Sequence, residues 1–125
     1  MTLSNYLENA IGNALRGGGA GTSYTAPAAI YAKLHTGDPG EAGTSNAATE
    51  TTRQEAQFGA ASGGVISLSN TPTWTNVAAT ETISHISIWD NSTAGNCLGS
   101  GALTASKALT AGDNFQLTAL TVTLD

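Results

Sequence analysis

This chain has few charged residues. Its 125 residues include four Lys or Arg and nine Asp or Glu, which gives a formal net charge of −5. Proteins that bind the phosphate backbone of nucleic acids need clustered Lys and Arg. We therefore expect no nucleic-acid partner. The length suits one domain with a core of its own and excludes a second large domain.

Cysteine, long apolar runs and a leader signal are also lacking. Because Cys97 is the one cysteine, an internal disulfide framework and a multi-cysteine zinc site are excluded. No run of 18 apolar residues is present, so we expect no membrane span. The N-terminus carries Glu8 and no basic stretch, which is unlike a signal peptide. We expect no metal, no cofactor and no membrane partner.

Small residues fill the space that charged residues leave. Ala, Thr, Gly and Ser together make up 66 of the 125 residues. Such a composition is compatible with disorder. However, 40% of the residues are apolar, and they fall in alternating clusters. This pattern predicts a folded domain.

The first 16 residues have helical periodicity. Apolar positions recur every three or four residues, with Thr2 or Asn5 as the N-cap and glycines after the last turn. We therefore predict a helical arm over residues 1–16, a Gly-rich linker over 17–23 and a β domain over 24–125. A short helix cannot bury its apolar stripe alone, so the stripe packs on the domain or on another chain. The predicted docking or oligomerisation residues are Leu3, Tyr6, Leu7, Ile11 and Leu15.

From residue 24 onward the apolar period changes to two. Residues 30–35 alternate, and residues 83–89 form the clearest strand, with Ile86 and Ile88 on one face and Ile83, His85 and Trp89 on the other. The alternation slips within residues 115–124, which predicts a bulge near residues 119–120. Seven to eight short strands with regular turn signals predict an all-β fold, an antiparallel, jelly-roll-like β-sandwich.

No set of residues has the spacing of a catalytic or metal site. His35 and His85 could join Asp38 or Asp90 at a metal, but their spacing is not diagnostic, and outward-facing strand positions explain them. The Gly-x-Ser-x-Gly elbow and a paired-carboxylate pattern are missing. Trp74 and Trp89 are core residues or possible interface aromatics. We therefore expect a protein that is not an enzyme.

Several segments resemble a family of small tailed-bacteriophage proteins commonly labelled tail fibre proteins. The resemblance rests on residues 3–10 (LSNYLENA), 24–27, 36–43 (TGDPGEAG), 58–61, 101–107 and 111–124. It implies a non-enzymatic structural protein of the virion, assembled in the bacterial host cytoplasm. Its partners would be other virion proteins of the capsid or tail. A homo-oligomer is expected, and virion geometry suggests a trimer.

The resemblance leaves two positions on the particle. Our main expectation is a module that decorates or cements the capsid exterior, because a small domain with a helical arm suits a clamp between capsomers. The alternative is a tail-fibre or tail-tip component that contributes to host recognition and contacts a host surface receptor.

Overall fold

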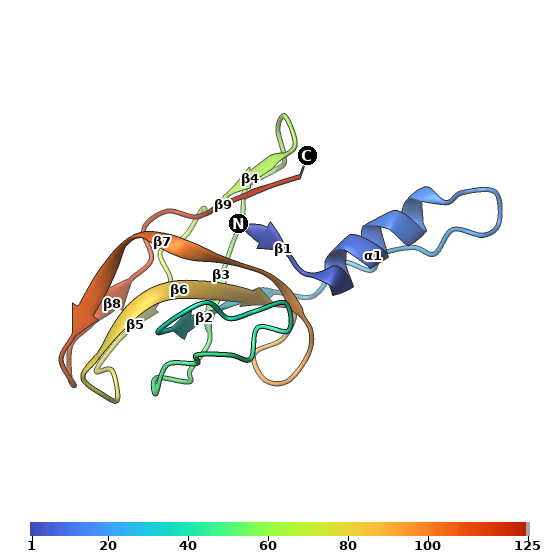
Figure 1. Cartoon of the computed structure of the whole chain (residues 1–125). Coiled ribbons are helices and arrows are strands. Elements are labelled where there is room, and N and C mark those ends of the chain that lie inside the picture. Colours follow the sequence, from blue (N-terminus) through green and yellow to red (C-terminus); the bar gives the residue numbers. More distant parts are fainter. Residues whose placement is uncertain (125) are drawn as a thin grey trace.

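One helix and three antiparallel sheets make up the structure, a computed structural model that describes residues 1–124 (Figure 1). The predicted all-β sandwich with a preceding short helix is confirmed. The elements are β1 (Thr2–Leu3), α1 (Asn5–Leu15), β2 (Ile30–His35), β3 (Gln54–Ala56), β4 (Val65–Ser67), β5 (Thr73–Trp74), β6 (Glu81–Trp89), β7 (Cys97–Leu109), β8 (Phe115–Gln116) and β9 (Thr121–Thr123).

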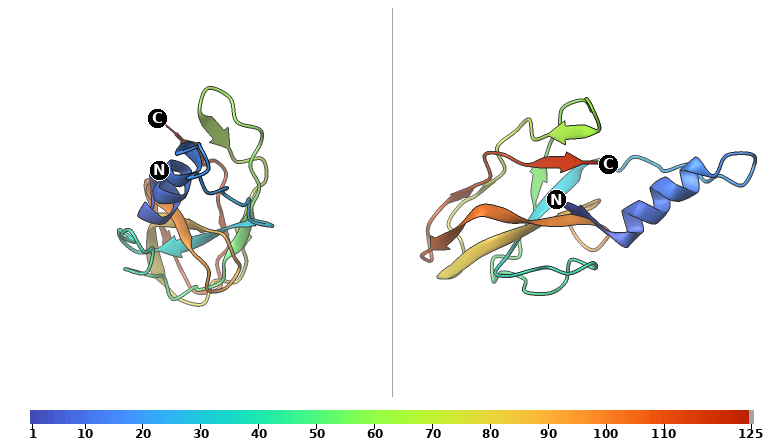
Figure 2. Two further views of the ribbon diagram at one scale, coloured as in Figure 1. Left: turned by 90° about the vertical axis from the view of Figure 1, so that its right-hand side faces the viewer. Right: turned by 45° about the horizontal axis from the view of Figure 1, so that its top comes forward.

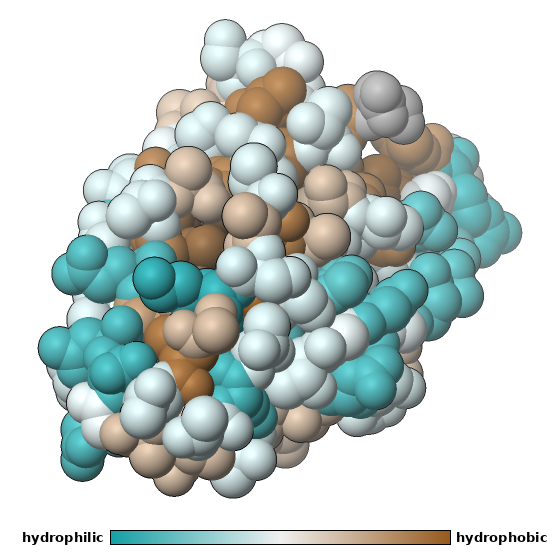
Figure 3. Space-filling view, turned by 60° about the vertical axis from the view of Figure 1, so that its left-hand side comes forward, coloured by the Kyte–Doolittle hydropathy of each residue, from teal (hydrophilic) through white to brown (hydrophobic). Residues whose placement is uncertain are grey.

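The main sheet has the strand order β1-β7-β6-β2-β3. Two smaller sheets, β4-β9 and β5-β8, lie over its inner face and share its core (Figures 1 and 2). The central strands β2 and β6 carry the alternating apolar residues that the sequence indicates, because each strand must bury one face. The face of the molecule in Figure 3 is mostly pale, as expected for a surface rich in threonine, serine and glycine.

Strand β6 does not keep one alternation throughout. The register with β7 shifts between Ile83 and His85. Because of this irregularity Ile83 turns inward and joins Ile86 in the core, fully buried. The predicted placement of Ile83 on the face of His85 and Trp89 is therefore wrong. Strict alternation cannot reveal a bulge whose cause lies in the partner strand.

The core consists of two adjoining clusters. The larger cluster lies between the main sheet and β5-β8, where the rings of Trp74 and Phe115 meet edge to face with centroids 5.7 Å apart. The buried indole N–H of Trp74 donates to the carbonyl of Thr52 at 2.7 Å. The smaller cluster contains Ile88, Leu98 and Val122 and lies beneath the start of the chain.

The last predicted strand is two strands. Residues 117–120 separate strands β8 and β9. Strand β8 pairs with β5, and strand β9 pairs with β4. Leu117 and Val122 are both buried although they differ in parity. The slip in the apolar pattern is real, but a break between two sheets causes it. The predicted bulge near residues 119–120 is wrong.

The helix begins later than the periodicity indicates. Thr2 and Leu3 form β1, which pairs with Ser100 and Gly99 of β7. The N-cap is Ser4, whose Oγ accepts a hydrogen bond from the backbone N–H of Leu7 at 3.3 Å, rather than Thr2 or Asn5. The division into arm, linker and β domain stays a prediction.

Candidate functional site

The helix and the return segment that follows it project from the sandwich (Figures 1 and 2). From here on, the arm means residues 5–25, that is, the helix together with the predicted linker and the two residues after it. Ser4 fixes its base, because the Ser4 N–H donates to the carbonyl of Leu98 and the Ser4 hydroxyl donates to the carbonyl of Cys97. A second tie comes from Glu41, whose carboxylate accepts from the N–H of Asn5 at 2.9 Å. A carboxylate at this position also favours the positive end of the helix dipole.

The five predicted docking residues divide into an inner and an outer group. Leu3 and Leu7 are partly buried and pack against the smaller core cluster. Ile11 is half-buried, whereas Tyr6 and Leu15 are 44% and 80% exposed. Leu3 and Leu7 therefore help to seat the arm, and Tyr6 and Leu15 remain free for contact.

Large exposed hydrophobic side chains gather on the arm. Tyr6, Leu15 and Tyr24 lie there, and Leu124 lies near the other end of the chain. No residue of α1 is buried. Single exposed apolar residues are ordinary, but three large ones on one short projection are typical of a surface that a partner covers. The arm is the candidate interaction site.

Both predicted interface aromatics are buried, Trp74 between the sheets and Trp89 outside the two core clusters. Trp74 is 1% and Trp89 is 5% exposed. Trp89 packs on the outer face of the main sheet, where the guanidinium of Arg53 lies 3.9 Å from its ring centroid. Arg53 also donates to the carbonyls of Asn91 and Ala94, which holds the loop after β6. Trp74 is a core residue, and Trp89 is buried by Arg53 and the covering loops on the outer face.

His35 is buried, which the sequence did not indicate. Its side chain lies on the outer face of β2, but residues 36–48 fold over it, so the predicted solvent-facing position is wrong. The indole N–H of Trp89 donates to Ser87 Oγ, and Ser87 Oγ lies 2.7 Å from His35 Nε2. His35 Nδ1 lies 3.0 Å from the carbonyl of Ser45 and must donate to it. With the neutral imidazole that burial favours, the Ser87 hydroxyl donates to the unprotonated Nε2.

Burial lowers the pKa of His35; the hydrogen bond to the Ser45 carbonyl offsets part of this, and the nearby charges of Lys33 and His85 add to the lowering. His85 stands directly opposite His35 in the β2–β6 register. The pair is close, yet the described residues contain no group of three or more His, Cys, Asp or Glu side chains able to hold a metal. Hydrogen bonds account for both histidines, since His35 bonds to Ser87 and Ser45 and His85 Nδ1 lies 2.8 Å from Ser84 Oγ.

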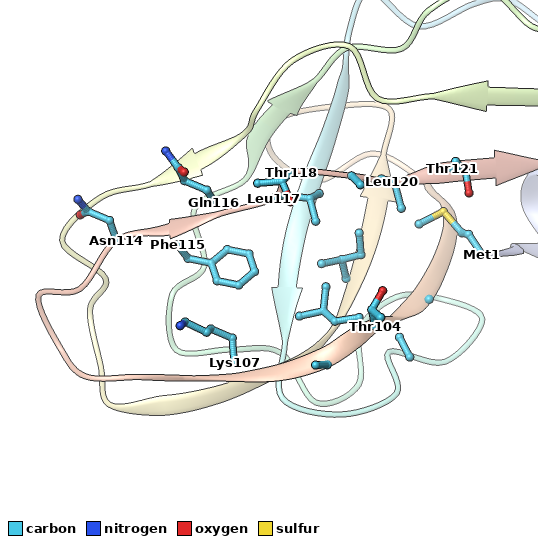
Figure 4. Close-up of a pocket in the computed structure, with 16 residues that line it drawn as sticks. Met1, Thr104, Lys107, Asn114, Phe115, Gln116, Leu117, Thr118, Leu120 and Thr121 are labelled. Atoms are coloured by element: carbon cyan, nitrogen blue, oxygen red, sulfur yellow. The ribbon is translucent and has the colours of Figure 1, made fainter.

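A cavity of about 520 Å³ opens between β7 and the segment that carries β8 and β9 (Figure 4). Phe115, Leu117 and Leu120 line it from one side, and Leu103 lines it from β7. Among its lining residues in the described chain, Lys107 has the one ionisable side chain. A general acid and base pair needs two such groups within reach of one substrate, so this lining does not form one.

No helix among residues 1–124 is long and apolar enough to cross a membrane. The fold and the projecting arm are those of a small β-sandwich module that presents a helix. Comparison with protein-family models defines the class as a phage fibre protein. The match is to the family described as "Podophage GP4 fiber I protein gp80" and extends over residues 2–125. The chain belongs to this family and is a virion component. A search of curated proteins gave no match.

Proposed function

We propose that this protein is a non-enzymatic structural component of the phage tail fibre, and that its arm attaches it to a neighbouring virion protein. The family match over residues 2–125 is the observation that carries the proposal. It supports the tail-fibre alternative of the sequence interpretation over capsid decoration, because the family is described as a fibre protein.

The arm supports the second half of the proposal. Its base is tied to β7 by β-pairing and by Ser4, so the arm is anchored to the sandwich at one end. Its outer surface carries Tyr6, Leu15 and Tyr24. Aromatic and large apolar side chains are enriched at the centres of protein interfaces, where charged residues are depleted. A partner that covers these side chains gains their burial without unfolding the sandwich.

The location on the particle tests the proposal. Particles are labelled with gold-conjugated antibody against this chain and imaged, and the copy number per particle is measured. We expect label on the tail and a handful of copies. Label over the head with hundreds of copies would support capsid decoration and overturn the tail assignment.

A competition assay tests the contribution to host recognition. Purified protein is added to host cells before the phage, and the adsorption rate is measured. If the sandwich contacts a host receptor, adsorption slows as the protein concentration rises. Unchanged adsorption at saturating protein, together with label at the tail, would leave a structural fibre role and remove the receptor role.

A further inference from the structure

The sandwich is open along one side. Strand β7 pairs with β6 on one edge, but on its other edge the described chain supplies only β1, which pairs with Gly99 and Ser100. The cavity of about 520 Å³ follows the rest of this edge, between residues 101–107 of β7 and residues 114–121 (Figure 4). We call this gap the seam. An additional strand in the seam would lie beside both of its walls.

Both walls of the seam contain backbone groups that no strand of the described chain pairs. The β6–β7 register shifts between Ile83 and His85, and within this shift residues 103–106 of β7 have no partner in β6. On the other wall, no backbone hydrogen bond in the described chain involves Thr118 or Ala119. Because backbone N–H and C=O groups need partners, water satisfies them until another backbone replaces it. An extended polypeptide segment supplies such donors and acceptors in a row.

The floor of the seam is apolar, and its rim is polar. Phe115 and Leu117 are buried and Leu120 is half-buried, whereas Gln116 and Thr118 between them are exposed. Figure 4 shows the Phe115 ring directed into the space between the two walls. Successive side chains of an extended segment point to opposite faces. Every second side chain of an occupant can therefore lie on this floor while the others meet the rim and water.

Strand β1 shows how this edge takes an extended segment. It comes from almost 100 positions away in the chain and pairs with β7 in the antiparallel direction. An occupant that runs along β7 in the same direction begins beside Lys107 and ends beside Met1, which lie at opposite ends of the seam (Figure 4). At roughly 3.3 Å per residue, the length of residues 101–107 corresponds to a segment of about five to seven residues.

Lys107 sets the charge of the occupant. It is exposed, and it has the one ionisable side chain among the lining residues in the described chain, so a carboxylate placed beside it complements the seam. The same edge of a second copy would instead bring a second lysine. A lysine and an irregular register are common ways to keep edge strands from pairing with copies of themselves. We propose that the seam binds an extended segment of a different protein chain, with apolar side chains at alternate positions and a carboxylate beside Lys107.

Fluorescence anisotropy with labelled peptides and the full chain tests this proposal. The probe is the N-acetylated peptide EVTVTVT with a fluorophore at its C-terminus, since an antiparallel occupant begins beside Lys107. The comparison peptides are KVTVTVT and EVTPTVT, whose central proline removes a backbone donor. We expect saturable binding of EVTVTVT and at least several-fold weaker binding of both comparison peptides. Absence of binding by EVTVTVT, or equal binding of the proline peptide, would overturn the proposal.

A charge exchange locates the peptide. Lys107→Glu should weaken the binding of EVTVTVT at least several-fold and strengthen the binding of KVTVTVT, because Lys107 is exposed and its replacement leaves the core intact. Arg16→Glu makes the same change of charge in the arm and should alter neither affinity. Unchanged peptide preference in Lys107→Glu, or an equal effect of Arg16→Glu, would refute the site.

Sedimentation of the chain without peptide tests the choice of occupant. Self-association that Lys107→Glu alters and Arg16→Glu leaves unchanged would assign the seam to a second copy and overturn the proposal, whereas we expect the two variants to sediment alike. The seam is separate from the arm, and particle location does not enter these experiments. Their outcome is therefore independent of the proposed tail-fibre role.

Discussion

The arm and the sandwich treat their large apolar side chains in opposite ways. The arm exposes Tyr6, Leu15 and Tyr24, whereas the described part of the sandwich exposes Leu124 alone among residues of this kind. Two hydrogen bonds made by Ser4 and one accepted by Glu41 hold the arm at its base. The sandwich derives its stability from its own core, and the arm derives its position from the sandwich. The difference separates residues that fold the protein from residues available to a partner.

Carboxylates reinforce this difference. In the sandwich they accept from backbone N–H groups and so fix loops: Glu81 accepts from Thr49 and Glu50, and Asp113 accepts from Thr110. Bonds of a charged group to the backbone are stronger than neutral ones. In the arm, Glu8 lies on the exposed first turn of the helix. Glu81 and Asp113 of the sandwich are therefore used where irregular backbone needs support.

The largest expected effect is the loss of Trp74. Trp74→Ala removes a buried ring that packs on Phe115 and bonds to Thr52, and we expect about 3–5 kcal/mol of destabilisation. Tyr6→Ala in the arm is the contrasting variant and should cost well under this amount, because Tyr6 is half in water. Urea denaturation measures both. Equal losses would mean that the arm belongs to the cooperative unit.

Gly43 gives the next largest effect. Its φ is +68°, and an added Cβ would lie 2.6 Å from Cys97 Sγ and 2.8 Å from Trp89 Cζ2. We expect Gly43→Ala to cost about 2–3 kcal/mol from overpacking and backbone strain. Gly18→Ala in the arm is a matched control, because its φ is also positive but the added Cβ meets nothing within 4 Å. Denaturation curves that give both variants the same loss in the free energy of unfolding would show that crowding against Trp89 is unimportant.

A smaller effect depends on pH. Burial keeps His35 neutral, so its pKa in the folded protein is below the ordinary value of about 6.5. As the pH falls through about 6.5, His35 takes up a proton in the unfolded chain before it does so in the folded protein. Stability is therefore full above about pH 6.5 and declines from there down to the pKa of folded His35.

Urea midpoints measured across this window check the assignment to His35. The decline should disappear in His35→Gln and persist in His85→Gln, which changes the opposite residue of the β2–β6 pair. If the decline instead disappears in His85→Gln, the effect belongs to His85 and the assignment to His35 is wrong. This pH effect belongs to the sandwich alone, because the described arm contains no histidine.

Local periodicity predicts much of this fold and little of its outer face. Residues 30–35 and 83–89 alternate because one face of each strand is buried, and that pattern is visible in sequence. His35 is buried by a loop that follows it, and such a covering loop leaves no periodic signal. Strand β1 escapes prediction for a similar reason, since two residues acquire strand geometry from a partner almost 100 positions away. The docking stripe was predictable as an apolar pattern, but its division into seated and exposed residues depends on the tertiary structure.

Leu15 separates stability from attachment and gives the smallest expected change in folding. It is 80% exposed, so Leu15→Asp should alter the free energy of unfolding by no more than about 0.5 kcal/mol. If the arm attaches the protein to the virion, however, the same change replaces buried apolar contact with a desolvated carboxylate. The lost burial alone is worth about 1.5–3 kcal/mol, which corresponds to at least a tenfold weaker attachment. Quantitative detection of the protein in purified particles measures this loss, with Leu124→Asp as the control for an exposed leucine outside the arm. Normal incorporation of Leu15→Asp, or equal loss with Leu124→Asp, would contradict attachment through the outer surface of the arm.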